Sequence, residues 1–216
     1  MERIICLLIG YACGLFQTAY IMGKIYHTDI RKQGSGNLGS TNVMRTLGKK
    51  AGALNLLCDC LKCVAAILIV RVLFEDRYAD ILPLLSLYAA AGCILGHNFP
   101  FYLNFKGGKG IAASVGLLAA FDWRLLLICA AVFFALFFTT HYVSLCSISA
   151  YVIAFILMVV FGQRGDYHMD QSHMLELYVV MAFLTVLALF RHKKNIQRLL
   201  DGTESQIYLG KKKKNQ

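Results

Sequence analysis

The chain has 216 residues, of which 58% are hydrophobic, and its mean hydropathy is +0.59. The apolar residues form long runs rather than short alternations, which excludes an ordinary soluble domain and indicates an integral membrane protein. The formal net charge is +10, and basic loops beside an anionic membrane surface explain it better than nucleic-acid binding, for which a soluble fold with exposed aromatic residues is expected.

Seven apolar runs predict membrane-spanning helices, because a helical span needs roughly 20 apolar residues. The fourth run is short for a span and predicts a short, tilted or re-entrant helix buried among its neighbours; five or six spans are alternative counts. The sequence thus predicts an all-α, polytopic helical bundle, with a single transmembrane domain over residues 1–200 and a basic tail over residues 201–216. In chain order the runs are 4–22, 51–74, 81–96, 111–121, 125–140, 143–161 and 175–190.

The distribution of charge orients this bundle. If the N-terminus lies outside, the segments 24–50, 97–110 and 191–216 lie inside, and they hold 6, 2 and 8 Lys and Arg residues. Cytoplasmic loops of membrane proteins are enriched in these residues. The sequence therefore predicts an outside N-terminus and a cytoplasmic C-terminus. The outer segments carry only single arginines, at Arg3, Arg77, Arg124 and Arg164.

Three polar segments interrupt the apolar runs, and the first spans residues 34–42 with Arg45 just beyond it. Its glycines allow positive φ and the close approach of a ligand, and Arg45 adds a bidentate cationic group. The same composition would also suit a polar loop between helices with a capping residue. The candidate site residues here are Gly34, Ser35, Gly36, Asn37, Thr41, Asn42 and Arg45.

The second polar segment, residues 105–110, comes directly before an apolar helix. Its glycines are expected to expose backbone N–H groups at the positive end of that helix, where an anion would bind. It is not a Walker A motif, because Gly110 follows Lys109 where Ser or Thr would hold magnesium. Lysines that snorkel to the membrane edge are the competing interpretation. The candidate site residues are Lys106, Gly107, Gly108 and Lys109.

The remaining candidates also lie near the ends of apolar runs. His97 follows the third run and could act as a general base, a phosphate donor or a helix-terminal cation. His192 and Asn195 belong to the third polar segment, residues 191–195, which follows the last run. Three residues apart, they share a helical face. Asp59 and Lys62 lie inside the second run, where ionisable groups normally face a bundle interior. This pair is expected to support the site rather than to react.

The eight cysteines do not indicate a metal site. Cys58, Cys60 and Cys63 point in different directions around one helix and cannot all reach a single ion. The other five are scattered singly in apolar runs, where cysteine behaves as a small hydrophobic residue. No metal and no cofactor are predicted.

Taken together, the polar segments resemble the PlsY family, the acyl-phosphate-dependent glycerol-3-phosphate acyltransferases of bacterial membranes. The resemblance covers nearly the whole chain in order. Several matching strings at matching separations make it specific, where any one alone would not. The strings are residues 34–42 with Arg45, 47–50, 96–100 with 105–110, 142–148, and 191–192 with 195–196 and 198–200.

This resemblance implies a multi-pass enzyme of the bacterial inner membrane with its active site on the cytoplasmic side. It implies transfer of an acyl group from acyl phosphate to the 1-hydroxyl of glycerol 3-phosphate, giving 1-acylglycerol 3-phosphate (lysophosphatidic acid) and phosphate, in the first step of phospholipid synthesis. Its partners would be both substrates, membrane lipids and, functionally, an enzyme that makes acyl phosphate.

The resemblance also implies residue roles. Ser35, Arg45, Lys109 and His192 are the expected catalytic residues. The phosphates are expected to be held by Ser35, Arg45, Lys106 or Lys109, His192 and Asn195. Further substrate-binding candidates are Gly34, Gly36, Asn37, Thr41, Asn42, His97, Gly107, Gly108 and Ser144.

The sequence departs from the family pattern at several positions. Ser40 stands where alanine is usual, Cys63 replaces a glycine, and His141 occupies a position where a basic residue, commonly arginine, is expected. The first run has Leu15 and Gln17 in place of the usual Gly-Ser-x-Pro pattern. His141 is expected to weaken a cation contact, and the altered first run suggests a divergent member.

Two other functions fit parts of the pattern. A transporter of phosphate or phosphate esters would also have basic loops and polar residues in its spans, but such proteins often contain internal repeats with paired broken helices, and the sequence shows no self-similar halves. An acyltransferase that uses a CoA thioester is expected to have Asp five residues after a His, and none of the six histidines has one.

Overall fold

The computed structural model describes residues 1–208, and within them the chain forms only helices and no β-strand. The predicted lysine run of the tail, Lys211 to Lys214, lies outside the described residues. In chain order the elements are α1 (Glu2–Gly14), α2 (Thr18–Ile25), η1 (Ile30–Lys32), α3 (Ser40–Leu47), α4 (Lys49–Tyr78), η2 (Ala79–Ile81), α5 (Leu82–Asn98), η3 (Phe101–Leu103), α6 (Ile111–Phe121), α7 (Trp123–Thr140), α8 (Val143–Gln163), α9 (Gln171–Arg191) and α10 (Lys193–Leu200).

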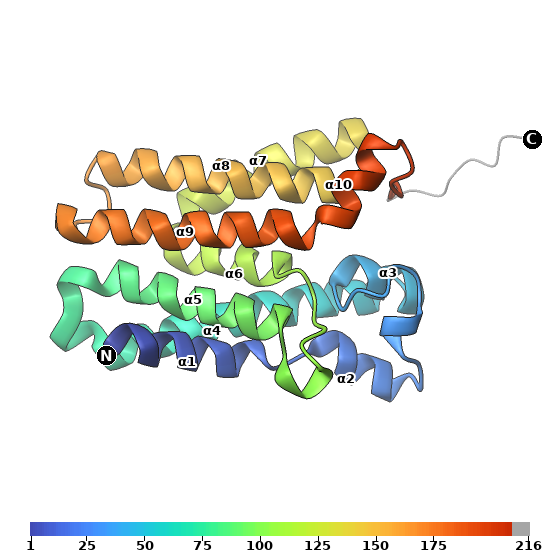
Figure 1. Cartoon of the computed structure of the whole chain (residues 1–216), viewed down its shortest axis with the longest axis horizontal. Coiled ribbons are helices and arrows are strands. Elements are labelled where there is room, and N and C mark those ends of the chain that lie inside the picture. Colours follow the sequence, from blue (N-terminus) through green and yellow to red (C-terminus); the bar gives the residue numbers. More distant parts are fainter. Residues whose placement is uncertain (209–216) are drawn as a thin grey trace, which may run out of the picture.

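The long helices lie side by side in two groups (Figure 1). One group contains α1, α4 and α5, and the other contains α7, α8 and α9, with α6 between them. The core runs through both groups and includes fully buried side chains from α4, α5, α6 and α9, among them Ile67, Leu85, Leu117 and Leu177. The all-helical bundle predicted from the sequence is therefore confirmed.

Within residues 1–208, four helical segments are long and apolar enough to cross a membrane: Glu2–Ile25, Trp123–Thr140, Val143–Gln163 and Gln171–Arg191. Large apolar side chains on these helices face outward, such as Leu8, Phe138 and Val186, which are 61%, 63% and 63% exposed. Such a surface suits contact with lipid. The other predicted runs also form helices, but the total of seven spans and the orientation of the termini remain predictions.

The short helix predicted over residues 111–121 has these bounds in the structure, as α6. Its 11 residues cover only about 16 Å at 1.5 Å per residue, which is about half of a hydrocarbon core of roughly 30 Å. Ala113 and Leu117 are fully buried, and α6 packs against α4, α5 and α7. It is therefore an internal helix whose two ends lie at different depths of the bundle.

The first predicted span, 4–22, is not one continuous helix. It breaks between Gly14 and Thr18, where α1 ends and α2 begins. Gln17 is buried at the break, and its Nε2 donates hydrogen bonds to the carbonyl oxygens of Gly14, Gly96 and His97 at 3.1, 3.3 and 3.1 Å. The bonds to Gly96 and His97 tie the break to the end of α5, so that protein rather than lipid surrounds it.

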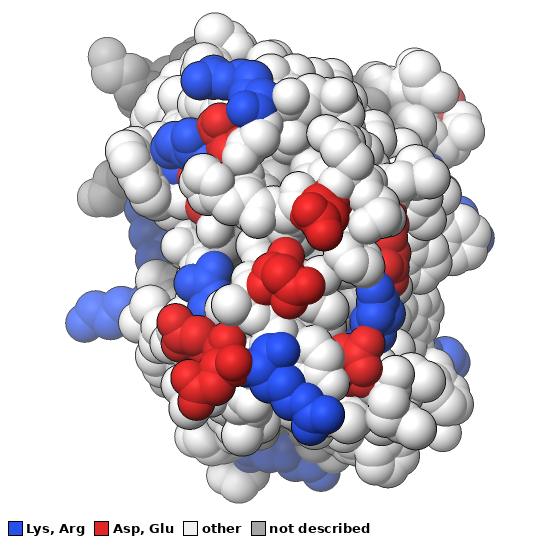
Figure 2. Space-filling model, turned by 90° about the vertical axis from the view of Figure 1, so that its left-hand side faces the viewer, with Lys and Arg blue, Asp and Glu red and all other residues white. Residues whose placement is uncertain are grey.

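The two ends of the bundle differ in charge. Figure 2 shows the end where the chain begins, on which acidic and basic side chains are interspersed. Apart from the buried Lys62, the lysines of the described chain lie at or near the opposite end, in the segments 24–50, 106–109 and 193–194. That opposite end also carries the three polar segments of the sequence, so the candidate site residues share one end of the molecule.

Candidate active site

Lys109 lies at the centre of a cluster of polar side chains that joins three parts of the chain. Its Nζ donates a hydrogen bond to Asn195 Oδ1 in α10. Asn195 Nδ2 in turn donates to Glu204 Oε1 at 2.6 Å, and Ser144 Oγ at the start of α8 donates to the same oxygen at 2.8 Å. Arg198 Nε pairs with Glu204 Oε2 at 2.6 Å. The second and third polar segments therefore meet here.

The electrostatics of Lys109 bring the first polar segment into the same region. Burial lowers the pKa of Lys109 to about 8, the Glu204 carboxylate opposes this, and the positive charges of Arg198, Arg191 and Arg45 lower it further. Arg45 belongs to α3, so all three segments contribute charge around Lys109. Lys106, by contrast, is exposed, and the structure places Lys109 rather than Lys106 within the cluster.

Glu204 is charged despite its burial. Its side chain is only 6% exposed, and burial alone would raise its pKa, but hydrogen bonds from Asn195, Arg198 and Ser144 hold the pKa below its usual value. No role for this residue is predicted from the sequence, because it falls in the segment assigned to a basic tail. Two carboxylates, Asp201 and Glu204, in a segment that otherwise ends in a run of lysines were the only signal available.

Residues 201–208 pack onto the bundle and carry Glu204 into the cluster. Ile207 is buried against Phe137 and Cys146, and its N–H donates to the His141 carbonyl oxygen at 2.9 Å. The Tyr208 ring contacts the His141 ring, with 4.4 Å between centroids. This first part of the predicted tail therefore lies against the turn between α7 and α8, beside the site.

His192 lies between α9 and α10 and is 2% exposed. Its Nδ1 contacts the Ala188 carbonyl oxygen at 2.8 Å, and because a carbonyl can only accept, Nδ1 carries the proton. Burial and the charge of Lys109 lower the pKa of His192 to about 4. The ring is therefore neutral at pH 7, and Nε2 is a hydrogen-bond acceptor suited to a hydroxyl rather than to a phosphate oxygen.

The backbone of the second polar segment is tied to neighbouring elements. The N–H groups of Gly107 and Gly108 donate to the carbonyl oxygens of Asn98 and His97, both at 3.1 Å. Arg191 Nη2 donates to the carbonyl oxygens of the same glycines at 3.1 and 2.6 Å. The expectation that these two amides are free to bind an anion is therefore wrong, because the end of α5 already uses them.

Gly108 serves a different purpose, which is close packing. A Cβ at this position would lie 2.0 Å from His97 Nε2, so only glycine lets the loop lie directly on the imidazole ring. The loop then turns through Gly110, with φ at 82°, into α6. The first-turn amides of α6 have no partner within the helix, and they follow Lys109 directly.

A buried polar network lies beneath the loop. Lys62 Nζ contacts Asp59 Oδ1 at 2.7 Å, His97 Nδ1 at 2.8 Å and the Phe16 carbonyl oxygen at 2.7 Å. Since the Lys62 ammonium can only donate, His97 Nδ1 must accept and Nε2 carries the proton of a neutral ring. His97 is therefore not the helix-terminal cation that was one of its three alternatives.

The same network reaches the first polar segment. Asn55 Nδ2 donates to Asp59 Oδ2 and to Ser40 Oγ, both at 2.9 Å, and Ser40 begins α3. Asp59 and Lys62 thus connect the break after α1, the end of α5 and the start of α3. This arrangement matches the supporting role expected for the pair.

Within the first polar segment, Asn42 organises the loop. It is 1% exposed; its Oδ1 accepts from the Ser35 N–H at 2.9 Å, and its Nδ2 donates to the carbonyl oxygens of Ile30 and Gln33 at 3.2 and 3.0 Å. The amide predicted to contact substrate is therefore committed to the protein's own backbone. The exposed side chains presented by this segment are those of Ser35 and Arg45.

The other predicted residues of this segment surround that loop. Gly34 and Gly36 are exposed and have positive φ, 53° and 69°, and Asn37 and Thr41 are half-buried around the start of α3. Met44, next to Arg45, packs against the cluster of Phe137, Cys146 and Ile207, which sets α3 beside the start of α8. Within residues 1–208, no group of three or more His, Cys, Asp or Glu side chains is placed to hold a metal ion.

Residues 4–202 match the family model described as glycerol-3-phosphate acyltransferase. The chain belongs to this family. The glycerol-3-phosphate acyltransferase of Clostridioides difficile (strain 630) is 42% identical over 212 residues, with 97% of each chain covered. The one from Lactiplantibacillus plantarum (strain ATCC BAA-793 / NCIMB 8826 / WCFS1) is 38% identical over 214 residues, covering 97% of this chain and 94% of the relative.

A solved member of the glycerol-3-phosphate acyltransferase family has the same fold. The crystal structure of PlsY (YgiH), an integral membrane glycerol 3-phosphate acyltransferase, in its glycerol 3-phosphate form matches with a TM-score of 0.82 and 30% identity over 96% of both chains. Its lysophosphatidic acid form matches with a TM-score of 0.80. Together with the four apolar segments, this likeness makes the present family member a multi-pass membrane protein.

Two departures from the family's pattern have structural partners in this acyltransferase family member. Gln17 holds the break after α1 through three carbonyl oxygens. His141 contacts Tyr208 through its ring and Ile207 through its carbonyl oxygen. Both residues therefore stabilise segments next to the site, and neither removes a side chain from the cluster around Lys109.

Proposed function

We propose that this protein transfers a fatty acyl group from acyl phosphate to the 1-hydroxyl of glycerol 3-phosphate. The hydroxyl oxygen bonds to the acyl carbon, the bond from that carbon to the phosphate oxygen breaks, and the products are 1-acylglycerol 3-phosphate and inorganic phosphate. Both substrates carry a phosphate, so the site must hold two anions next to a membrane. The reaction needs no metal and no cofactor in this proposal.

The observation that carries this proposal is the gathering of cations around Lys109. Arg45, Arg191 and Arg198 come from three helices and are close enough to lower the pKa of this lysine. The only carboxylate among the causes of that shift is Glu204, which Arg198 already pairs. A cluster with excess positive charge, partly buried at the end of a membrane bundle, favours phosphate groups.

Acyl phosphate is already activated, so the protein mainly has to orient the two substrates and stabilise developing negative charge. In the proposed arrangement Lys109 and Arg45 hold phosphate oxygens, and Ser35 lies at the exposed edge of the site. His192 Nε2 accepts a hydrogen bond from the glycerol hydroxyl and orients it. A phosphate oxygen of the substrate takes the hydroxyl proton, so no protein side chain needs to act as the base.

The decisive experiment supplies two donors to the purified protein. With glycerol 3-phosphate labelled in its carbon skeleton, palmitoyl phosphate is expected to give labelled 1-acylglycerol 3-phosphate, and palmitoyl-CoA none. Lys109→Ala should lose most of this activity, whereas Lys194→Ala, an exposed lysine on α10, should keep it. Product from palmitoyl-CoA alone would show that acyl phosphate is not the donor. No product from either donor would favour the alternative function, transport of phosphate or phosphate esters.

We also propose that the site faces the cytoplasm of a bacterial inner membrane, where an enzyme that makes acyl phosphate could supply the donor. A membrane-impermeant amine reagent tests this orientation. Right-side-out vesicles should be labelled at the Met1 amine and inverted vesicles at Lys106 and Lys193, since these amines are exposed at opposite ends of the bundle. Labelling of all three from the same side would contradict the arrangement.

A further inference from the structure

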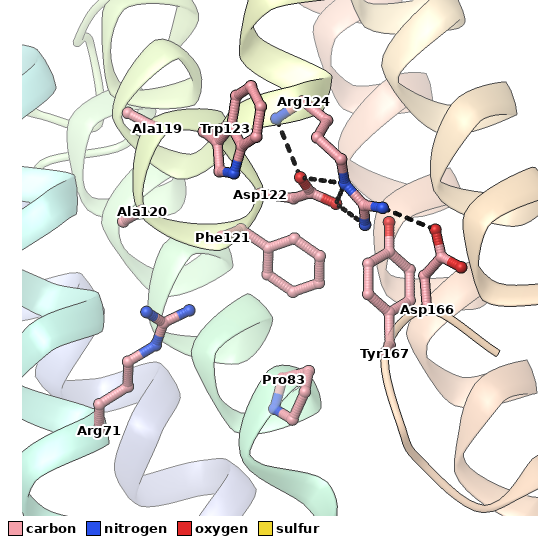
Figure 3. Close-up of a pocket in the computed structure, with 10 residues that line it drawn as sticks. All are labelled: Arg71, Pro83, Ala119, Ala120, Phe121, Asp122, Trp123, Arg124, Asp166 and Tyr167. Atoms are coloured by element: carbon pink, nitrogen blue, oxygen red, sulfur yellow. Dashed lines mark hydrogen bonds and ion pairs between the residues drawn. The ribbon is translucent and has the colours of Figure 1, made fainter.

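A cavity lies at the other end of α6, away from Lys109. Its volume is about 590 Å³, which is within the usual range of ligand sites, roughly 300 to 1,000 Å³. It is lined by the end of α6, the start of α7, the α8–α9 connection, Pro83 of α5 and Arg71 of α4 (Figure 3). The cavity exists because α6 is short: beyond Phe121 the neighbouring helices continue and leave space that α6 does not fill.

One side of this cavity is a closed network of charges. Asp122 accepts from the Arg124 N–H at 2.9 Å and so caps α7. The Arg124 guanidinium pairs with Asp122 and with Asp166, both at 2.8 Å. Figure 3 shows this group together with Tyr167 on one side of the cavity and Arg71 on the other. The cation of Arg124 therefore has its counter-ions, and it is not the group in need of a ligand.

Arg71 does lack a counter-ion. Within residues 1–208 no carboxylate lies at ion-pair distance from it, and the one hydrogen bond of its guanidinium, to Ser86 Oγ, is long at 3.4 Å. Arg71 precedes the end of α4 at Tyr78 by about 10 Å along the helix axis. A charge at that depth in a membrane protein is costly and normally has a partner.

Tyr167 supplies the second, independent observation. The residue is 8% exposed, and in the described part of the chain its buried hydroxyl has no hydrogen-bond partner. Its ring is fixed edge-to-face against Phe121, with 5.3 Å between centroids, so the hydroxyl cannot easily turn to water. A buried hydroxyl left without a partner is unfavourable, because it has lost its hydrogen bonds to water and gained none in return. The cavity is thus lined by a guanidinium without a counter-ion, that of Arg71, and by a hydroxyl without a hydrogen-bond partner, that of Tyr167.

We propose that this cavity binds the headgroup of a membrane phospholipid, with the phosphate on Arg71 and a donor-bearing end, an ammonium or a hydroxyl, toward Tyr167 and Asp122. The charges of the lining suit a zwitterionic headgroup, because Arg71 carries the unpaired positive charge and the carboxylates of Asp122 and Asp166 lie on the opposite side. Trp123, 66% exposed at the rim, is an aromatic residue of the kind found at membrane interfaces.

The lipid chains have an apolar surface to follow. On α4, Val72 and Leu73 follow Arg71 in the sequence and are 80% and 62% exposed. A lipid whose headgroup enters the cavity can therefore keep its chains in the bilayer. This site is separate from the proposed acyl-transfer site, because α6, about 16 Å long, lies between them, and it does not depend on that reaction.

The test measures lipid retention by the delipidated full-length protein in detergent, using native mass spectrometry. Phosphatidylethanolamine is the probe, and diacylglycerol of the same chains is the lipid without a phosphate. Wild type is expected to retain the phospholipid at least tenfold better than diacylglycerol, in line with a hydrogen bond to a charged group. Arg71→Gln should remove this preference, whereas Arg77→Gln, an exposed arginine of the same helix, should keep it.

Further measurements distinguish lipid binding at this cavity from misfolding of the variant and from binding of a soluble anion. Arg71→Gln should retain its acyltransferase activity, which shows that the bundle is folded. Tyr167→Phe should reduce the preference for phosphatidylethanolamine over phosphatidylcholine, whose headgroup has no N–H donor. Equal retention by wild type and Arg71→Gln, or equal retention of diacylglycerol by wild type, would overturn the proposal. Displacement of the lipid by millimolar inorganic phosphate would also overturn it, since the site would then be one for a soluble anion. If Arg71→Gln does not fold, the wild-type comparison of the two lipids decides.

Discussion

The lowered pKa of Lys109 predicts an alkaline limit to catalysis at an unusually low pH. Burial brings this pKa to about 8, against an ordinary lysine value of about 10.4. The ammonium can hold a phosphate only while it is protonated. The activity that depends on it should therefore be nearly complete at pH 7 and below, and decline as the pH rises through about 8.

The size of the effect follows from the fraction of Lys109 that is charged. With a pKa of about 8, roughly nine-tenths of the free enzyme carries the charge at pH 7 and slightly under one-tenth at pH 9, so kcat/KM for glycerol 3-phosphate should fall about tenfold between them. Lys109→Arg should lose this decline, because arginine stays charged over the whole range. Its overall activity is expected to be lower, since the two cations differ in shape.

Glu204→Gln extends the same reasoning. The Glu204 carboxylate raises the pKa of Lys109 against the effect of burial, so its neutralisation should lower that pKa and move the alkaline decline to lower pH. The assay is the initial rate with labelled glycerol 3-phosphate at saturating palmitoyl phosphate, with Lys194→Ala as the control profile. A wild-type profile flat to pH 10, or an unchanged decline in Lys109→Arg, would refute the assignment of this limit to Lys109.

Two further substitutions probe the support beneath the site. Lys62→Met leaves the Asp59 carboxylate buried without its 2.7 Å partner, which should cost about 3–5 kcal/mol of stability and lower the unfolding midpoint by about 10 °C. Adding Asp59→Asn to Lys62→Met should restore most of that loss. Thermal unfolding in detergent compares the single and the double variant. Gly108→Ala places a Cβ 2.0 Å from His97 Nε2, so the loop that carries Lys109 must shift. Its kcat/KM for glycerol 3-phosphate should fall about a hundredfold, and a value near wild type would show that the loop position is unimportant.

The elements that the sequence predicted well are those whose signals are local. The bounds of α6 follow from an apolar run framed by Gly110 and by Asp122, which caps the next helix. Lys109 and Asn195 come together because each lies in a polar segment at the same end of the bundle. A turn residue, a cap or the end of an apolar run is visible in a single sequence, so these features could be placed without coordinates.

The features that it missed depend on partners far away in the chain. The break after α1 is stabilised by Gln17 through carbonyl oxygens of Gly96 and His97, about 80 residues later. The amides of Gly107 and Gly108 looked available because their acceptors lie at the end of α5. Glu204 receives its hydrogen bonds from α8 and α10, and its place in the sequence gives no hint of them.

The two inward-facing lysines show how the site separates support from binding. An ammonium group has three protons to donate. Lys62 uses its three protons in hydrogen bonds to Asp59, His97 and the Phe16 carbonyl oxygen. It therefore has no proton left to donate to a ligand, and its role is to hold these three groups together. Lys109 donates to Asn195, its one hydrogen bond within residues 1–208, and thus retains two protons near an excess of positive charge. By this count an arriving phosphate can bind Lys109 without breaking the network below it.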